Sequence, residues 1–172
     1  GLDPAPGPEM KSTGEVFGSD IRADLAYLKA RLATEIPVAT EGGAYLTVRE
    51  EDKADLVPIA QSLIDLNFTI FATPGTADVL RKANIPVTTS YRIAERMHPD
   101  SLDLMRKGDV NFIVNVPTIS GGAVRDGNMM RRLAVELNIP FVTTMRGAVM
   151  EVAAMKASME NVLEPRRLEV HY

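Results

Sequence analysis

Residues 68–83, FTIFATPGTADVLRKA, are the stretch that decides the fold. Phe68 to Ala72 is a short apolar run with β-branched and aromatic side chains, which predicts a buried strand. Pro74 and Gly75 end that strand in a turn, and Thr76 to Ala83 is predicted to be a helix. A strand that passes through a tight turn into a helix is typical of β-α-β architecture, so we expect alternating strands and helices.

The same alternation continues on both sides of this stretch. Residues 110–116 form the most apolar segment, as expected for a strand buried on both faces of a parallel sheet. Right-handed crossovers between such strands place helices on both faces. The sequence therefore predicts an α/β fold with three layers, a doubly wound and mainly parallel five-stranded sheet. We expect strands at residues 44–49, 68–72, 86–88, 110–116 and 141–143, and helices at residues 55–66, 76–83, 101–107, 126–137 and 145–158.

The predicted helices also carry several packing expectations. Pro58 lies within residues 55–66 and is tolerable only near the first turn of a helix. Methionine is a flexible residue that fills gaps in apolar cores, so we assign the methionines on predicted helices to packing. They are Met129, Met130, Met145, Met150 and Met155. Leu137, at the end of the predicted helix at residues 126–137, is also expected to face inward.

The first forty residues differ from the rest. Three prolines among the first eight residues interrupt any periodicity, and no helix or strand is expected before Ser19. From Ser19 a helix is expected, capped by Ser19 or Asp20 and ending before Pro37. Its apolar stripe is Ile21, Leu25, Leu28 and Leu32. Residues 35–43 are typical of a linker, so we predict three parts: residues 1–18, a connecting helix and linker at 19–40, and a main domain at 41–172.

Composition excludes several classes of protein. A net charge of -4 and a hydrophobic fraction of 45% are ordinary for a globular protein and disfavour nucleic acid as a partner. The absence of cysteine excludes disulfides and thiolate metal sites, and it is compatible with a reducing compartment, so a cytoplasmic location is expected. The sequence has no apolar run of the length a membrane span needs, so no membrane association is expected.

Ligands of doubly wound sheets collect at the carboxyl ends of the strands, where helix N-termini favour anions. Thr73, Gly75 and Thr76 follow the strand at 68–72 and offer two hydroxyls and a close backbone approach. Lys53 follows the first strand and supplies a positive charge. Alternatively, Thr76 simply caps its helix above a tight turn, and Lys53 lies in a solvated helix start.

The later strands add further candidates at the same edge. Arg92 follows the third strand, and Asn115 and Thr118 follow the fourth, in a loop that continues through residues 120–122. Together with Lys53, Thr73 and Thr76, these side chains predict a pocket for a phosphate-bearing ligand. In that pocket Asn115 would hydrogen-bond a sugar or base.

Catalytic and metal-binding patterns are weak. The chain has two histidines and no HExxH or GxSxG motif, so a metal site is not expected. His98 and Asp100 are close enough in sequence to form an acid–base pair, although a surface histidine beside Pro99 is more often merely solvated.

Residues 7–16, GPEMKSTGEV, closely resemble the end of the second ATP-grasp half of carbamoyl-phosphate synthase large subunits. The remainder resembles the C-terminal domain of that family, which shares a Rossmann/flavodoxin-like fold with methylglyoxal synthase. The matching motifs are residues 47–53 (TVREEDK), residues 71–76 (FATPGT) and Arg131-Arg132. Residues 1–18 would then be the tail of the preceding ATP-grasp domain.

The resemblance implies an allosteric domain that binds uridine monophosphate or inosine monophosphate, and ornithine at the junction with the preceding domain. Lys53, Thr73, Thr76 and Arg92 match effector phosphate contacts. Thr47, Asn115 and Thr118 match nucleoside contacts, and Thr143 matches an ornithine contact. Arg92 stands where lysine is familiar in the family, and Val142 stands where aspartate is familiar.

The resemblance also implies partners and cofactors of a whole enzyme. These are the rest of the large subunit, the glutaminase small subunit and homo-oligomer contacts, with ATP and magnesium or manganese used upstream. The residues present here are expected to need no cofactor and to be non-catalytic by themselves. Two alternatives remain: a methylglyoxal synthase-type enzyme that acts on dihydroxyacetone phosphate with Asp100 as base, and a structural oligomerisation domain.

Overall fold

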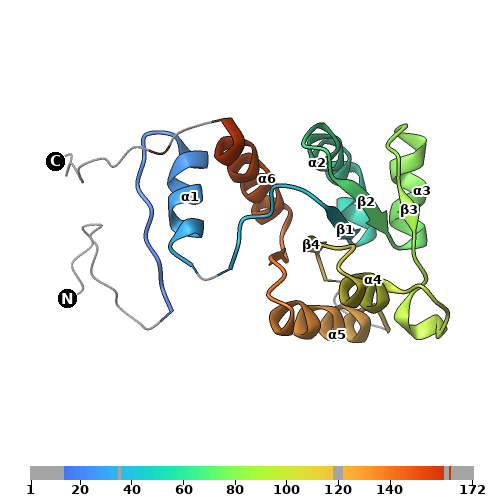
Figure 1. Ribbon diagram of the computed structural model, residues 1–172. Helices are drawn as coiled ribbons and strands as arrows, with labels where there is room; N and C mark the ends of the chain where they lie inside the picture. Colours follow the sequence, from blue (N-terminus) through green and yellow to red (C-terminus); the bar gives the residue numbers. More distant parts are fainter. Residues whose placement is uncertain (1–13, 35, 118–121, 161–162, 164–172) are drawn as a thin grey trace.

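A computed structural model describes residues 14–34, 36–117, 122–160 and 163 of the chain (Figure 1). The described residues form one five-stranded sheet in the order β3-β2-β1-β4-β5. Every neighbouring pair of strands is parallel, which confirms the predicted α/β class. The strands are β1 (Gly43–Thr47), β2 (Thr69–Ala72), β3 (Thr88–Thr89), β4 (Phe112–Asn115) and β5 (Phe141–Val142).

Within the described residues, six α-helices and two short 3-10 turns connect or extend these strands. The helices are α1 (Ala23–Leu32), α2 (Lys53–Asp65), α3 (Pro74–Lys82), α4 (Ser101–Lys107), α5 (Gly122–Glu136) and α6 (Met145–Glu160). The 3-10 turns are η1 (Glu50–Asp52) and η2 (Ile93–Glu95). None of the helices in the described ranges is both long and apolar enough to cross a bilayer.

The strands separate two apolar layers because successive side chains point to opposite faces of a sheet. Leu46 on β1 packs in one core with residues of α2, α3 and α6, whereas its neighbour Tyr45 packs in the other core with residues of α4 and α5. The larger core includes Leu56, Leu80, Phe112 and Val152, and the smaller includes Leu102, Met105, Ile113 and Met130. This is the predicted three-layer arrangement.

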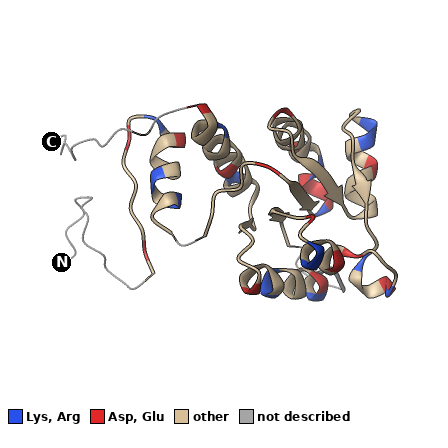
Figure 2. Cartoon of the chain, viewed as in Figure 1, with Lys and Arg blue, Asp and Glu red and all other residues tan. Residues whose placement is uncertain are grey.

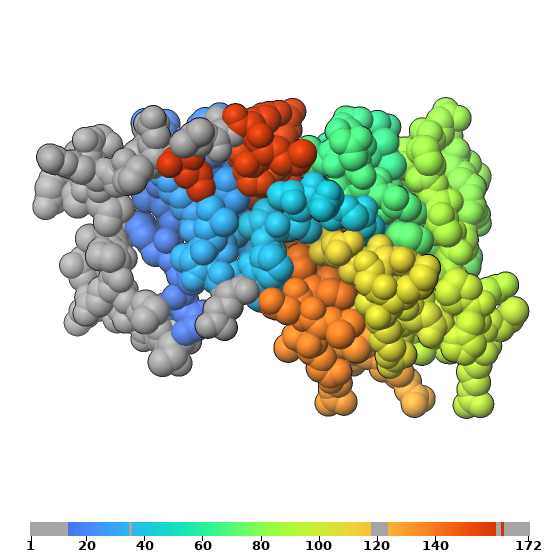
Figure 3. Space-filling model, in the orientation of Figure 1, coloured from blue at the N-terminus to red at the C-terminus, as the bar shows by residue number. Residues whose placement is uncertain are grey.

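The connecting helix α1 packs on α6 at one end of the molecule, and α3 lies at the opposite end (Figures 1 and 3). Leu28 is fully buried between α1 and α6 beside Ala154 and Ala157. The contact joins the predicted connecting segment to the main domain. The division of the chain at residue 40 stays a prediction.

The expected start of the first helix is wrong. The helix begins at Ala23, and Arg22 occupies the N-cap position without a side-chain cap. Asp20 instead accepts a hydrogen bond from Lys29 Nζ at 2.7 Å. Ile21 is 87% exposed and Leu32 is 55% exposed, because α1 contacts the rest of the protein mainly along its α6-facing side. The predicted apolar stripe is therefore only partly buried.

Two other packing expectations need correction. The turn η1 leads directly into α2 at Lys53, so the helix starts two residues earlier than expected and Pro58 lies inside it, beyond its first turn. Met130 and Met155 are buried as predicted, but Met129 is 40% exposed and Leu137 is 42% exposed. Both lie on the outer side of α5 or just after its end, where they do not face the sheet.

Candidate anion-binding site

A cavity of about 410 Å³ lies where β1, β2 and β4 end, under η2 and the start of α5. Six of the site residues predicted from the sequence line this cavity: Thr47, Lys53, Thr73, Thr76, Arg92 and Asn115. These residues come from four separate segments of the chain. The parallel sheet brings them together because all its strands end at the same edge.

The two threonines at the β2–α3 turn form one wall. Thr73 is the N-cap of α3, but its side chain makes no capping hydrogen bond; its hydroxyl contacts that of Thr76 at 3.3 Å. The alternative in which Thr76 caps the helix is therefore wrong. Thr76 is 1% exposed and lies in the first turn, where the helix dipole favours negative charge. This wall suits an anionic oxygen.

Lys53 supplies a positive charge next to this wall. Its side chain is 13% exposed, and Nζ lies 2.5 Å from Oε2 of Glu50, a carboxylate that is itself 82% exposed. A methyl group added to Gly75 would lie 3.0 Å from Lys53 Nζ, so the glycine lets the ammonium approach the β2–α3 turn closely. The alternative of a solvated helix start holds for Glu50 and Glu51, whose side chains are exposed, but the Lys53 side chain itself is mostly buried.

The remaining candidates are less uniform. Arg92 lines the cavity from the N-cap position of η2 and is exposed. Thr143, the predicted ornithine contact, is exposed after β5 and does not line this cavity. Thr118 lies outside the described residues. The structure thus brings together the phosphate and nucleoside candidates that it describes, and it leaves Thr143 elsewhere.

The cavity is also lined by residues that sequence reasoning did not assign to the site: Tyr45, Ser101, Asp126 and Met130. The Tyr45 hydroxyl lies 2.7 Å from Ser90 Oγ, and burial raises the pKa of Tyr45 to about 12. Asp126 Oδ2 accepts a hydrogen bond from the Ala94 amide at 3.4 Å, which links α5 to η2. The sequence places Tyr45 in the first predicted strand, but a tyrosine in a strand is more often a packing residue of the core than part of a binding site.

Arg131 was noticed only as part of a motif and was not assigned to the site. Its Nη1 donates to Oδ1 of Asn115, and its Nη2 donates to Oδ1 of Asn128 at 2.5 Å. Asn115 is 5% exposed. Arg131 follows Gly127 by four residues and therefore lies on the same face of α5. That spacing was the sequence signal that could have placed Arg131 near the site.

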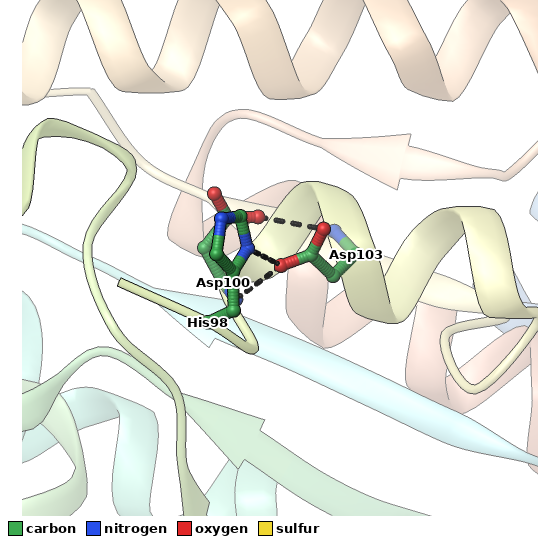
Figure 4. A group of neighbouring side chains, drawn as sticks. All are labelled: His98, Asp100 and Asp103. Atoms are coloured by element: carbon green, nitrogen blue, oxygen red, sulfur yellow. Dashed lines mark hydrogen bonds and ion pairs between the residues drawn. The ribbon is translucent and has the colours of Figure 1, made fainter. Parts of the chain in front are cut away.

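The acid–base pair between His98 and Asp100, which the sequence favoured less than a solvated histidine, is not formed. His98 Nδ1 lies 2.5 Å from Oδ2 of Asp103, whereas Asp100 caps α4 by accepting from the amides of Leu102 and Asp103 (Figure 4). The hydrogen bond with Asp103 raises the pKa of His98, and the same bond lowers the pKa of Asp103. None of the three lines the cavity, so this cluster is a helix cap with a surface ion pair.

Charge over the rest of the surface is mixed, with lysine and arginine interspersed among acidic residues on the helices (Figure 2). The concentration of Lys53 and Arg92 at one strand edge is therefore a local feature. It suits a small anionic ligand held by a few directed contacts more than a long polyanion.

The parallel three-layer sheet with a polar cavity at its carboxyl edge defines an α/β domain of the doubly wound class. The chain belongs to the MGS-like domain family, whose pattern it matches over residues 55–143. It is 44% identical over 158 residues to the carbamoyl phosphate synthase large chain, C-terminal section, of Methanocaldococcus jannaschii, covering 91% of this chain and 25% of that protein. It is 42% identical over 162 residues to the protein of the same description from Methanopyrus kandleri, covering 94% of this chain and 28% of that protein. It is 40% identical to the carbamoyl phosphate synthase large chain of Archaeoglobus fulgidus, covering 91% of this chain and 14% of that protein.

The chain therefore spans about a quarter or less of the length of these three relatives. The similarity extends over nearly all of the present residues, including the connecting helix. The family expected from the sequence motifs is confirmed.

Proposed function

We propose that this chain is the C-terminal regulatory domain of a glutamine-dependent carbamoyl-phosphate synthase and that its cavity binds nucleoside monophosphate effectors. The observation that carries the proposal is the convergence of Lys53, Thr73 and Thr76 at the N-terminus of α3. A phosphate placed there would meet an ammonium group, two hydroxyls and the positive end of a helix dipole. Uridine monophosphate and inosine monophosphate are the proposed ligands.

The rest of the cavity suits a nucleoside. Thr47, Asn115, Asp126 and Met130 also line the cavity. Hydroxyl, amide and carboxylate groups can hydrogen-bond a sugar or the polar edge of a base, while an apolar side chain can pack against the face of a base. The volume of about 410 Å³ is within the range of small-ligand sites.

In the whole enzyme, binding would modulate carbamoyl phosphate synthesis for arginine and pyrimidine biosynthesis in the cytoplasm. Such control requires the ligand to bind active and inactive states with different free energies, typically by about 1–3 kcal/mol. The partners would be the rest of the large subunit and the glutaminase subunit, with homo-oligomer contacts. ATP with magnesium or manganese would act in those other parts, and this domain would be non-catalytic.

Ornithine is proposed to bind at Thr143, in a separate site. Thr143 is exposed and does not line the nucleotide cavity, so the two effectors would not compete directly. The enzyme alternative is less well supported, because Asp100 is committed to capping α4 and does not line the cavity. The open cavity also argues against a purely structural role.

Calorimetric titration tests the proposal with uridine monophosphate, inosine monophosphate and uridine as ligands. Wild type should bind both nucleotides saturably and uridine much more weakly. Lys53→Gln, and the double variant Lys53→Ala with Thr76→Ala, should weaken nucleotide binding by roughly 10- to 100-fold, because a charge-assisted contact contributes about 1.5–3 kcal/mol. Lys82→Gln, at the far end of α3, is the matched control and should bind like wild type. No saturable binding, or equal binding by Lys53→Gln, would refute the proposal.

Ornithine needs its own titration. Thr143→Ala should weaken ornithine binding and leave nucleotide binding unchanged, whereas Lys53→Gln should have the reverse effect. Competition between ornithine and uridine monophosphate would contradict two separate sites.

A further inference from the structure

Arg131 and Asn115 form a contact beside the cavity, which Asn115 lines. Asn115 lies at the carboxyl end of β4 with only 5% of its surface exposed, and Arg131 reaches it from α5. The same guanidinium also contacts Asn128 Oδ1, so it is held at two points. Gly127 leaves room for the contact: a methyl group there would lie 3.0 Å from both Arg131 Nη1 and Asn115 Oδ1.

The chemistry of arginine determines how the Asn115 amide is turned. A guanidinium has five N–H donors and no acceptor, whereas an asparagine side chain has one acceptor oxygen and one NH₂ donor group. Only the oxygen of Asn115 can therefore face Arg131. The reverse orientation would place donor against donor in a site almost closed to water, which is costly.

This orientation turns the NH₂ group of Asn115 away from Arg131. Among the described residues Nδ2 has no hydrogen-bond partner. Asn115 lines the cavity, and the NH₂ group is the part of its amide that remains to meet a ligand there.

We propose that Arg131 is a positioning residue that fixes the Asn115 amide with its NH₂ group toward the cavity, so that the site selects a nucleoside monophosphate whose base presents a carbonyl oxygen there. The inference rests on the proposed function and adds a specificity rule to it. A base with an amino group at the same place would set donor against donor and leave both without a partner. Arg131 acts on the ligand only through Asn115.

Two matched ligand pairs test this rule. Inosine monophosphate carries an oxo group at position 6 where adenosine monophosphate carries an amino group. Uridine monophosphate carries an oxo group at position 4 where cytidine monophosphate carries an amino group. Calorimetry on the full chain should show that wild type binds the oxo member of at least one pair on the order of tenfold more tightly, as one directed hydrogen bond would give. Equal affinity within both pairs, or preference for amino bases, would overturn the inference.

Variants test the part played by Arg131. Arg131→Met should abolish the oxo preference while binding of inorganic phosphate is kept, and Arg131→Lys, which also only donates, should restore much of the preference. Asn115→Asp replaces the NH₂ group by an acceptor and should invert the ratio toward amino bases. Arg132→Met is the control, because Arg132 is exposed on the same helix and does not line the cavity.

The outcomes separate this inference from the proposed function. If phosphate and nucleotides bind through Lys53 but Arg131→Met keeps the wild-type oxo-to-amino ratio, the positioning role is refuted and the proposed function stands. If no nucleotide binds to wild type, both are refuted. Circular dichroism and thermal unfolding show whether Arg131→Met folds. Asn115→Asp gives an independent result, because it should reverse which member of each ligand pair binds more tightly.

Discussion

Arg31 on α1 holds Glu151 on α6 through both carboxylate oxygens, with Nε 3.0 Å from Oε1 and 2.9 Å from Oε2. Tyr27 donates a further hydrogen bond to Oε2 at 2.8 Å. Glu151 is 1% exposed, so its charge is almost completely removed from water. A buried carboxylate needs such partners, and both partners come from the connecting helix.

Arg31→Met should lower the free energy of unfolding by about 3–5 kcal/mol, because it leaves Glu151 buried without its counter-charge. The double variant Arg31→Met with Glu151→Met should recover much of that loss. Urea denaturation at neutral pH measures both. Lys156→Met is the control: its pair with Glu160 spans 3.9 Å between exposed side chains and should contribute less than about 1 kcal/mol. If Arg31→Met were as stable as the double variant, the stabilising role of the buried pair between Arg31 and Glu151 would be contradicted.

The tyrosines predict a loss of stability at high pH. Burial raises the pKa of both Tyr27 and Tyr45 to about 12 from the ordinary value of 10.0. Because the folded-state pKa is raised, the stabilising contribution is complete below pH 10 and is lost as pH rises to about 12. Unfolding measured across this range should show the decline. Tyr27→Phe, which cannot ionise, should make the decline shallower; an unchanged profile would contradict this assignment.

Glu50 would compete with the proposed anionic ligand for Lys53, since the two side chains lie 2.5 Å apart. Glu50→Gln should tighten binding of inorganic phosphate by roughly two- to fivefold, a modest effect because Glu50 is mostly exposed and exposed pairs contribute about 1 kcal/mol or less. Titration at low and high salt checks the cause, because screening should reduce the gain. Glu51→Gln, which removes an exposed neighbouring charge, is the matched control. Weaker phosphate binding by Glu50→Gln would contradict this prediction.

The surface pair at the start of α4 predicts the behaviour of His98. Its pKa is raised by the hydrogen bond with Asp103, so its contribution to stability is present below pH 6.5 and lost as pH rises through the folded-state pKa. The pKa of Asp103 is lowered, so its contribution is present above pH 3.8 and lost on further acidification. Proton NMR should place the His98 midpoint above 6.5, and Asp103→Asn should lower it. A His98 titration midpoint that does not change in Asp103→Asn would refute the ion pair between His98 and Asp103. The variant His98→Gln identifies which NMR signal belongs to His98.

Much of the fold was predictable because its causes are local. The apolar strand at residues 110–116 and the turn after Ala72 depend on neighbours in sequence, and both lie close to where they were expected. Helix starts were less predictable: the N-cap of α1 is Arg22, and η1 moves the start of α2 to Lys53. Such boundaries depend on packing against distant elements as well as on local propensity.

The candidate site was partly predictable for a related reason. Once a parallel sheet is expected, residues that follow its strands must gather at one edge, which is why Lys53, Thr76 and Asn115 share a cavity. The partner of each side chain could not be predicted. Asp100 turned out to be a helix cap, and the role of Arg131 depends on which atom of Asn115 it meets.

The sequence by itself determined the alternation of strands and helices, the family, and the edge of the sheet at which the candidate residues gather, because these follow from short-range patterns repeated along the chain. Only the tertiary structure decided that Glu151 is neutralised by Arg31, 120 residues away, and that Arg131 turns the amide of Asn115. Hydrogen-bond direction and burial are properties of groups that meet in space, and no local pattern encodes which groups will meet.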